Sequence, residues 1–260
     1  MINFSAIYLV IGAVFLYVNL LFILALLVKK NDIMDIAWGL GFIIITALSL
    51  LLDPGYHWRR ILVSALVTLW GARLLIYIYL RNKGKKEDFR YAQWRKDWGK
   101  NWVLRSYLQV FLLQGFFMLT IAYPLFLFNQ GQFKAFGFLD VIGLLIWIIG
   151  FGFEAIGDAQ MRRFKANPQN KGKIMNKGLW KLTRHPNYFG ESAMWWGIFI
   201  IALSNLHGWL AIFSPIIITT LLLRVSGVPM LEKKYKDNPA YQRYIQKTSS
   251  FVPWFPRKKL

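Results

Sequence analysis

The chain has 260 residues, of which 56% are hydrophobic and 17% are charged, and its formal net charge is +20. This composition excludes an ordinary soluble domain, and the lack of Cys excludes disulfides, thiolate metal sites and thiol catalysis. The three His residues lack a second His at helical spacing, so no metal site is predicted.

Seven apolar runs follow one another along the chain, each near the roughly 20 residues that a membrane-spanning helix needs. They are 5–28, 33–53, 60–80, 106–128, 138–156, 186–204 and 208–226. The first run is long enough to span and has no basic segment before it, so no cleavable signal peptide is expected. We therefore predict an all-α integral membrane protein, a bundle of seven transmembrane helices in one membrane domain over 1–260.

The basic residues fall almost entirely in alternate loops and in the C-terminal tail. The opposite loops hold Arg59, Arg60 and Lys134, and Arg73 lies inside the third run. Because cytoplasmic loops carry the excess of Lys and Arg, this pattern predicts an N-terminus outside and a C-terminus in the cytosol. The positive charge thus indicates membrane topology and membrane-lipid contacts, and no nucleic acid partner is predicted.

Ionisable residues within apolar runs are costly and mark functional candidates. They are Asp35, Arg73, Glu154, Asp158 and Glu191. All of them fall in the cytosolic half of the predicted bundle. Salt bridges that hold helices together are the structural alternative.

The segment LTRHPNYFGES, residues 182–192, predicts an anion site at the start of the sixth run. Pro186 suits the first turn of a helix, whose free N–H groups and dipole favour a phosphate. Arg184 and the lysines of the preceding segment add positive charge. Asn187 and Glu191 are four residues apart, so both can face one ligand, such as a nucleotide. Alternatively, Arg184 and Tyr188 anchor the membrane interface and Glu191 pairs with Arg73. The glycines of GFGFEAIG, residues 150–157, indicate close helix packing and not a phosphate loop.

Several segments together resemble one family. GLWKLTRHPNYFGES, LEKKYKDNPAYQRYIQKTSSFVPWFP, MDIAWG, GDAQMRRFK and LWGARLLIYIYLRNKGKKEDFRY are similar to the steroid 5-alpha-reductase-like membrane proteins, in particular to their bacterial branch of the DUF1295 type. The resemblance covers most of the chain and is strongest from 157 to 256. It implies a seven-helix bundle with a cofactor cavity open to the cytosol, in which 1–128 forms the substrate-side half and 138–260 the cofactor-binding half.

The resemblance also implies NADPH as cofactor and reduction of a carbon–carbon double bond in an enone lipid, a hydrophobic steroid- or isoprenoid-like substrate. The cofactor-binding candidates are Asn82, Asp158, Arg162, Lys165, Arg184, His185, Asn187, Tyr188, Glu191, Tyr241 and Tyr244. The catalytic candidates are Asp35, Arg73, Tyr91 and Glu191, with Asp35 or Tyr91 as proton donor. The steroid enzymes carry a Gln–Glu pair after a Trp in the second span and a Tyr in the third. Here Gly39 follows Trp38, and Trp70 stands where that Tyr is expected.

Two other functions stay open at this point. The isoprenylcysteine carboxyl methyltransferases also carry HP-x-Y-x-G with a later carboxylate, and they bind S-adenosylmethionine. A non-catalytic lipid-binding protein would use Arg73 and Glu191 as structural partners. The lack of Cys and the family branch favour a bacterial cytoplasmic membrane over the endoplasmic reticulum.

Overall fold

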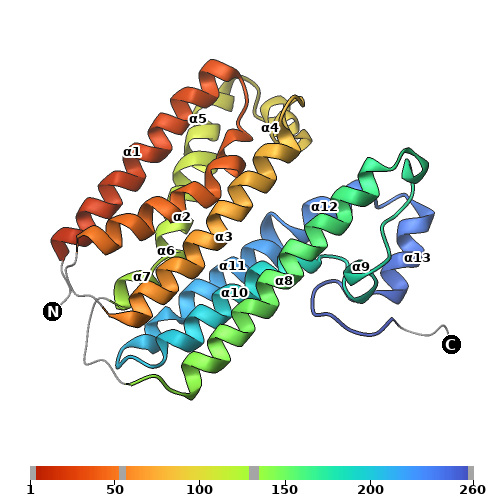
Figure 1. Cartoon of the computed structure of the whole chain (residues 1–260). Coiled ribbons are helices and arrows are strands. Elements are labelled where there is room, and N and C mark those ends of the chain that lie inside the picture. The colour runs from red at the N-terminus through yellow and green to blue at the C-terminus, as the bar shows by residue number, and fades with distance from the viewer. Residues whose placement is uncertain (1–3, 53–56, 129–134, 257–260) are drawn as a thin grey trace. The chain divides into compact units, whose positions relative to one another are not determined.

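The computed structural model describes residues 4–52, 57–128 and 135–256 (Figure 1). Within those ranges the regular elements are helices, and an isolated β-bridge joins Thr183 to Ser249. The chain divides into two compact units, Met1–Lys134 with Asn205–Ala211, and Ala135–Ser204 with Ile212–Leu260.

The first unit is built from three long helices and a fourth, interrupted one. Its elements are α1 (Phe4–Val28), α2 (Ile33–Leu51), α3 (Trp58–Asn82), α4 (Phe89–Trp98), η1 (Gly99–Asn101), α5 (Trp102–Ser106), the π-helical η2 (Tyr107–Leu112), α6 (Leu113–Ile121) and α7 (Pro124–Leu127). The backbones of α2 and α3 touch, because a Cβ on Gly39 would lie 2.2 Å from the carbonyl oxygen of Gly71. Beside this contact, the buried rings of Phe42 and Trp70 pack edge to face with centroids 5.1 Å apart.

The second unit contains the remaining helices. They are α8 (Phe138–Ala166), η3 (Pro168–Asn170), α9 (Leu179–Leu182), α10 (Pro186–Ala202), η4 (Gly208–Ile212), whose first residues belong to the other unit, α11 (Phe213–Thr220), the π-helical η5 (Leu221–Val225), α12 (Val228–Lys234) and α13 (Pro239–Lys247). In Figure 1, α8 and α10 run side by side in green and cyan.

Glycines allow α8 and α10 to approach closely. A Cβ on Gly143 would lie 2.5 Å from the carbonyl oxygen of Gly197, and one on Gly150 would lie 2.6 Å from that of Gly190. A Cβ on Gly157 would lie 3.1 Å from Cγ of Pro186. The small residues thus recur every seven positions along α8 and form what we call the glycine seam. This confirms the packing predicted for Gly150 and Gly157, whereas the same prediction was wrong for Gly152, where a Cβ would meet nothing within 4 Å.

Six helices of the described chain are long and apolar enough to cross a membrane. They are Ser5–Val28, Ile33–Leu51, Trp58–Asn82, Phe89–Leu127, Phe138–Ala166 and Gly208–Lys233. The protein is therefore a multi-pass integral membrane protein. The seventh expected span forms α10, which has 17 residues and is not among these six. Polar Asn187, Glu191 and Ser192 occupy its first turns, so the count of seven and the orientation stay predictions.

Two segments expected to be loops are helical. The basic stretch 81–105 contains α4 and α5, because the Asp88 carboxylate caps α4 by accepting the N–H of Arg90 at 3.0 Å. Similarly, α8 continues ten residues past 156, to Ala166, where Pro168 holds Asn167 in an extended conformation. Arg59 and Arg60, expected in a loop, are buried in the first turn of α3. Asp53, Lys134 and the basic residues at 257–259 lie outside the described residues.

Candidate functional site

The candidate residues fall into one group in each unit. Asp35, Arg73, Asn82 and Tyr91 lie in the first unit. The second unit holds Asp158, Arg162, Lys165, Arg184, His185, Asn187, Tyr188, Glu191, Tyr241 and Tyr244. Their functional roles stay predictions, and each group is described by its own contacts.

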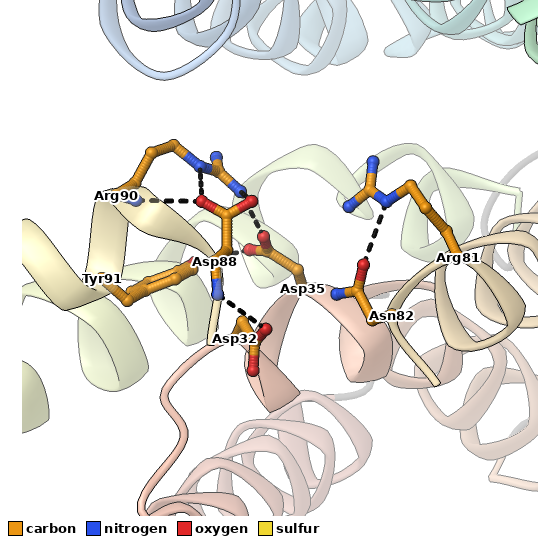
Figure 2. A network of polar contacts seen from close by, with 7 residues as sticks. All are labelled: Asp32, Asp35, Arg81, Asn82, Asp88, Arg90 and Tyr91. Carbon is orange, nitrogen blue, oxygen red and sulfur yellow. Dashed lines mark hydrogen bonds and ion pairs between the residues drawn. The ribbon is translucent and has the colours of Figure 1, made fainter. Parts of the chain in front are cut away.

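In the first unit, Asp35 is the centre of a polar cluster between α2 and α4 (Figure 2). It lies in the first turn of α2, and its Oδ1 accepts the hydroxyl proton of buried Tyr91. Arg90 Nη2 donates to Asp35 Oδ2 at 2.6 Å, and Arg90 Nε donates to Asp88 Oδ1 at 2.9 Å. The hydroxyl of Tyr91 is therefore held against a carboxylate whose charge Arg90 balances.

Further contacts tie the segment before α2 to the segment before α4. Asp32 Oδ2 accepts the N–H of Asp88 at 3.0 Å, and the N–H of Asn31 donates to Glu87 Oε1 at 2.7 Å. Glu87 also pairs with Arg95 at 2.9 Å. Residues more than 50 positions apart are thus joined at the base of the Asp35 cluster.

The two outer aspartates of this cluster differ in their acidity. Burial raises the pKa of Asp32 above its ordinary value, against the opposing effect of the Asp88 N–H. Burial alone would raise the pKa of Asp88 as well, but the hydrogen bonds and charge of Arg90 outweigh burial and lower it. The ionised form of Asp88 is therefore favoured in the fold.

Arg73 and Asn82 make separate contacts along α3. The Arg73 guanidinium lies 5.8 Å from the ring centroid of Tyr77, one turn away. Asn82 Oδ1 accepts from Arg81 Nε at 3.1 Å, and this pair lies to one side of the Asp35 cluster in Figure 2. The Nδ2 of Asn82 is buried and has no hydrogen-bond partner within the described ranges.

In the second unit, the glycine seam brings the intramembrane acids together. Glu154 and Asp158 are buried on the α8 face that carries Gly150 and Gly157. A Cβ on Gly190 would lie 2.6 Å from the Glu154 backbone nitrogen. Glu191 follows Gly190 directly and is also buried. The i,i+4 spacing therefore places Glu154 and Asp158 on the face of α8 that contacts α10 next to Glu191.

Asn187 lies at the same contact, one turn before Glu191. Gly157 is its neighbour on α8, since a Cβ there would lie 3.5 Å from the Asn187 backbone nitrogen. The Asn187 Oδ1 is buried, and the described part of the chain offers it no hydrogen-bond partner. α10 begins at Pro186, as predicted. An amide acceptor is thus left for an external donor beside the first turn of α10.

Arg184 and His185 are engaged by the C-terminal segment, which sequence reasoning did not foresee. Arg184 Nε donates to Glu232 Oε1 at 2.8 Å, and its Nη1 donates to the Thr248 carbonyl at 2.7 Å. His185 Nε2 is 3.1 Å from the same Glu232 oxygen, and its ring stacks on Tyr188. Glu232 and Asp237 are the two acids of an otherwise basic tail, and this was the available signal. The Arg184 charge is therefore balanced within the protein.

The two tail tyrosines lie against this ion pair. The hydroxyl of Tyr244 donates to the Trp180 carbonyl. The centroids of the Tyr244 and Tyr241 rings are 5.9 Å apart. Burial raises the pKa of both tyrosines, so both hydroxyls stay protonated. Arg162 and Lys165, in contrast, are exposed on the last turns of α8. They remain accessible to an anionic ligand.

These features define a multi-pass α-helical membrane protein with acids and amides gathered where its helices meet. The profile of a family described as "Protein of unknown function (DUF1295)" matches residues 21–248. The chain belongs to this family, which is the steroid 5-alpha-reductase-like family, and the resemblance is confirmed.

Two relatives are similar to parts of the chain. An uncharacterized protein of Schizosaccharomyces pombe, C594.04c, is 28% identical over 225 residues, which are 75% of this chain and 64% of the relative. The chain thus spans less than two thirds of that relative's length. The probable O-methyltransferase ustE of Ustilaginoidea virens is 44% identical over 46 residues, which are 18% of this chain and 16% of the relative. No solved structure matches the chain.

Proposed function

We propose that this protein is an NADPH-dependent membrane reductase of a carbon–carbon double bond in an enone lipid. The observation that carries the proposal is the unsatisfied Oδ1 of Asn187, one turn before buried Glu191 at the glycine seam. Polar groups buried in a membrane helix are costly, so a ligand that hydrogen-bonds to them explains their presence. Membership of the steroid 5-alpha-reductase-like family supports the same reading.

The residues of the second unit fit a dinucleotide. Asn187 Oδ1 offers an acceptor for a hydroxyl or amide donor of NADPH, and the buried carboxylates of Glu191 and Asp158 lie at the same helix–helix contact. Arg162 and Lys165 are exposed cations and suit the 2′-phosphate of NADPH, because hydrogen bonds from a cation to a phosphate are charge-assisted. We assign Arg184 and His185 to holding the tail segment over this region through Glu232, together with Tyr241 and Tyr244. When bound, NADPH supplies a hydride to the electron-poor alkene carbon.

For the first unit, we propose that the Tyr91 hydroxyl donates the proton that completes the reduction. The hydroxyl donates to Asp35 Oδ1, so it must turn from Asp35 to the substrate carbon before it transfers its proton, and the Arg90 guanidinium, 5.4 Å from the centroid of the Tyr91 ring, would balance the phenolate that forms. Arg90 Nη2 pairs with Asp35 Oδ2 at 2.6 Å, and Asp35 Oδ1 fixes the position of the Tyr91 hydroxyl. For Arg73 and Asn82 on α3, the family resemblance supports a catalytic role and a cofactor-binding role, respectively. The charge pattern and the family branch support a bacterial cytoplasmic membrane with a cytosolic C-terminus.

A methyltransferase is the second candidate, and one observation favours it. A 46-residue stretch is 44% identical to a protein named as a probable O-methyltransferase. The acceptors at the glycine seam would then bind the amino and hydroxyl groups of S-adenosylmethionine. Exposed Arg162 and Lys165 would have no phosphate to bind, and this difference separates the two functions.

Ligand titration in detergent or nanodiscs tests the proposal. The 12 tryptophans make the protein an energy donor to bound NADPH, so binding quenches their emission. We expect saturable quenching by NADPH, about tenfold weaker binding in Asn187→Ala because an amide hydrogen bond is lost, and no change in Gln246→Ala, which removes an exposed amide from α13. Binding of S-adenosylmethionine alone would support the methyltransferase. Binding of neither ligand would favour a non-catalytic lipid-binding protein.

A further inference from the structure

The residues that follow α13 present large apolar side chains outward. Val252, Trp254 and Phe255 are 59%, 70% and 81% exposed. We call residues 249–256 the tail strap. Exposed aromatic side chains on a well-held backbone indicate a surface that another apolar phase covers.

The backbone of the tail strap is fixed to the segment that leads into α10. The N–H of Arg184 donates to the Ser249 carbonyl at 2.8 Å, and the N–H of Trp254 donates to the Leu182 carbonyl at 3.0 Å. Thr183 and Ser249 form the parallel β-bridge. The aromatic side chains are therefore held at a set height relative to the second unit.

The sequence of α8 relates that height to the edge of a membrane. Trp180 Nε1 donates to the Gly157 carbonyl at 3.0 Å, and Gln160 Oε1 accepts the N–H of Leu179 at 3.0 Å. On α8, which is long and apolar enough to cross a membrane, position 157 lies in the stretch from Glu154 to Lys165 in which acidic, amide and basic residues replace the apolar run. The tail strap is thus anchored at the level at which α8 leaves the hydrocarbon core, where Trp and Phe find the headgroup region.

The charge of the C-terminal segment indicates which kind of lipid the tail strap would contact. From residue 238 to the end of the chain there is no acidic residue, whereas Arg243, Lys247, Arg257, Lys258 and Lys259 are basic. Aromatic residues at the interface combined with basic residues attract anionic headgroups. We propose that the tail strap docks into the adjacent leaflet, with Trp254 and Phe255 in the headgroup layer and a preference for anionic phospholipid. Docking would hold the strap, and with it the contact of Arg184 with Thr248, in place.

The cysteine-free chain makes the test direct. Phe255→Cys and, as a matched control, Gln246→Cys on the exposed side of α13 are labelled with an environment-sensitive fluorophore. Each is placed in nanodiscs of phosphatidylcholine with or without phosphatidylglycerol and with doxyl-labelled lipid. We expect at least about twofold stronger quenching at 255 than at 246, since interfacial segments enter the headgroup boundary by ~5–10 Å. We expect phosphatidylglycerol to increase the quenching at position 255 further.

Each outcome is decisive. Equal quenching at the two positions would overturn the docking. A blue-shifted label at 255 that doxyl lipid does not quench would indicate contact with protein, such as a second copy, and would overturn it too. Quenching that is independent of phosphatidylglycerol would overturn the anionic preference. Replacing Arg257, Lys258 and Lys259 by Gln should reduce the effect of phosphatidylglycerol, because Arg243 and Lys247 remain, and an unchanged effect would contradict the assigned role of the three residues.

Discussion

In the first unit, the acids Asp35 and Asp88 share Arg90, and the cluster joins the beginnings of two helices through paired side chains. In the second unit, Glu154, Asp158 and Glu191 are buried where glycines bring two helix backbones together. The first arrangement depends on opposite charges from separate segments. The second depends on the absence of side chains at Gly150, Gly157 and Gly190. Ion pairing thus connects the helices in the first cluster, whereas close packing of two helices positions the acids in the second.

The largest effect is expected from filling the glycine seam. Gly190→Ala would place a Cβ 2.4 Å from the Gly150 carbonyl oxygen, so the helices must separate at a cost of about 3 kcal/mol. Gly152→Ala is the same change where nothing lies within 4 Å, and it should raise stability by up to about 1 kcal/mol. Thermal unfolding in detergent compares them. Similar stability of the two variants would show that the seam does not hold the second unit.

The Asp35 cluster is tested by Tyr91→Phe. If the Tyr91 hydroxyl donates a proton, turnover should fall about 100-fold, in the range typical of a lost acid catalyst. Tyr17→Phe is the control, because the Tyr17 hydroxyl donates to the Ala37 carbonyl at 2.7 Å and has no acidic partner there. Both variants should lose about 1 kcal/mol of stability. NADPH oxidation with a panel of enone lipids and thermal unfolding are measured for both variants, and together they separate a catalytic role of the hydroxyl from a structural one. Parallel losses of activity in both variants would make the cluster purely structural.

In the second unit, the comparison of two arginines separates structure from binding. Arg184→Ala leaves Glu232 without its main partner and should cost about 2 kcal/mol of stability, less than a fully buried pair because Glu232 is 21% exposed. Arg162→Ala, at an exposed position, should change stability by less than about 0.5 kcal/mol. It should, however, weaken binding of NADPH more than that of NADH. Unchanged nucleotide preference in Arg162→Ala would remove its assigned role.

The smallest effect concerns pH, and it has opposite signs at two neighbouring aspartates. Because the fold lowers the pKa of Asp88, its stabilisation is present above the ordinary pKa and is lost as the pH falls through the lowered value. The pKa of Asp32 is raised, so its protonated form favours the fold at low pH, and this contribution disappears as the pH rises through the raised value. Unfolding from pH 3 to 7 should therefore become less acid-sensitive in Asp88→Asn and more so in Asp32→Asn. Equal slopes would contradict the assignment.

The helices predicted from the sequence agree with the structure where their formation depends on neighbouring residues alone. Apolar runs near 20 residues became helices because the backbone must bond to itself in lipid, and Pro186 begins α10 because its fixed φ suits a first turn. Helices in polar surroundings were harder to predict, because α4 and the end of α8 carry charged residues that also occur in loops. α10 begins at the predicted residue but ends at Ala202, two residues before the end of its predicted span.

For the candidate site, the sequence by itself determined which residues are costly in a membrane and which of them share a helix face, such as Asn187 with Glu191. Only the tertiary structure decided their partners. Arg184 meets Glu232 across 48 positions and Tyr91 meets Asp35 across 56, and no periodicity links such distant residues. The physical reason is that helix formation follows local hydrogen bonding and hydrophobicity. The pairing of charges follows from which helix surfaces approach closely enough, and glycines set that distance at the α8–α10 contact.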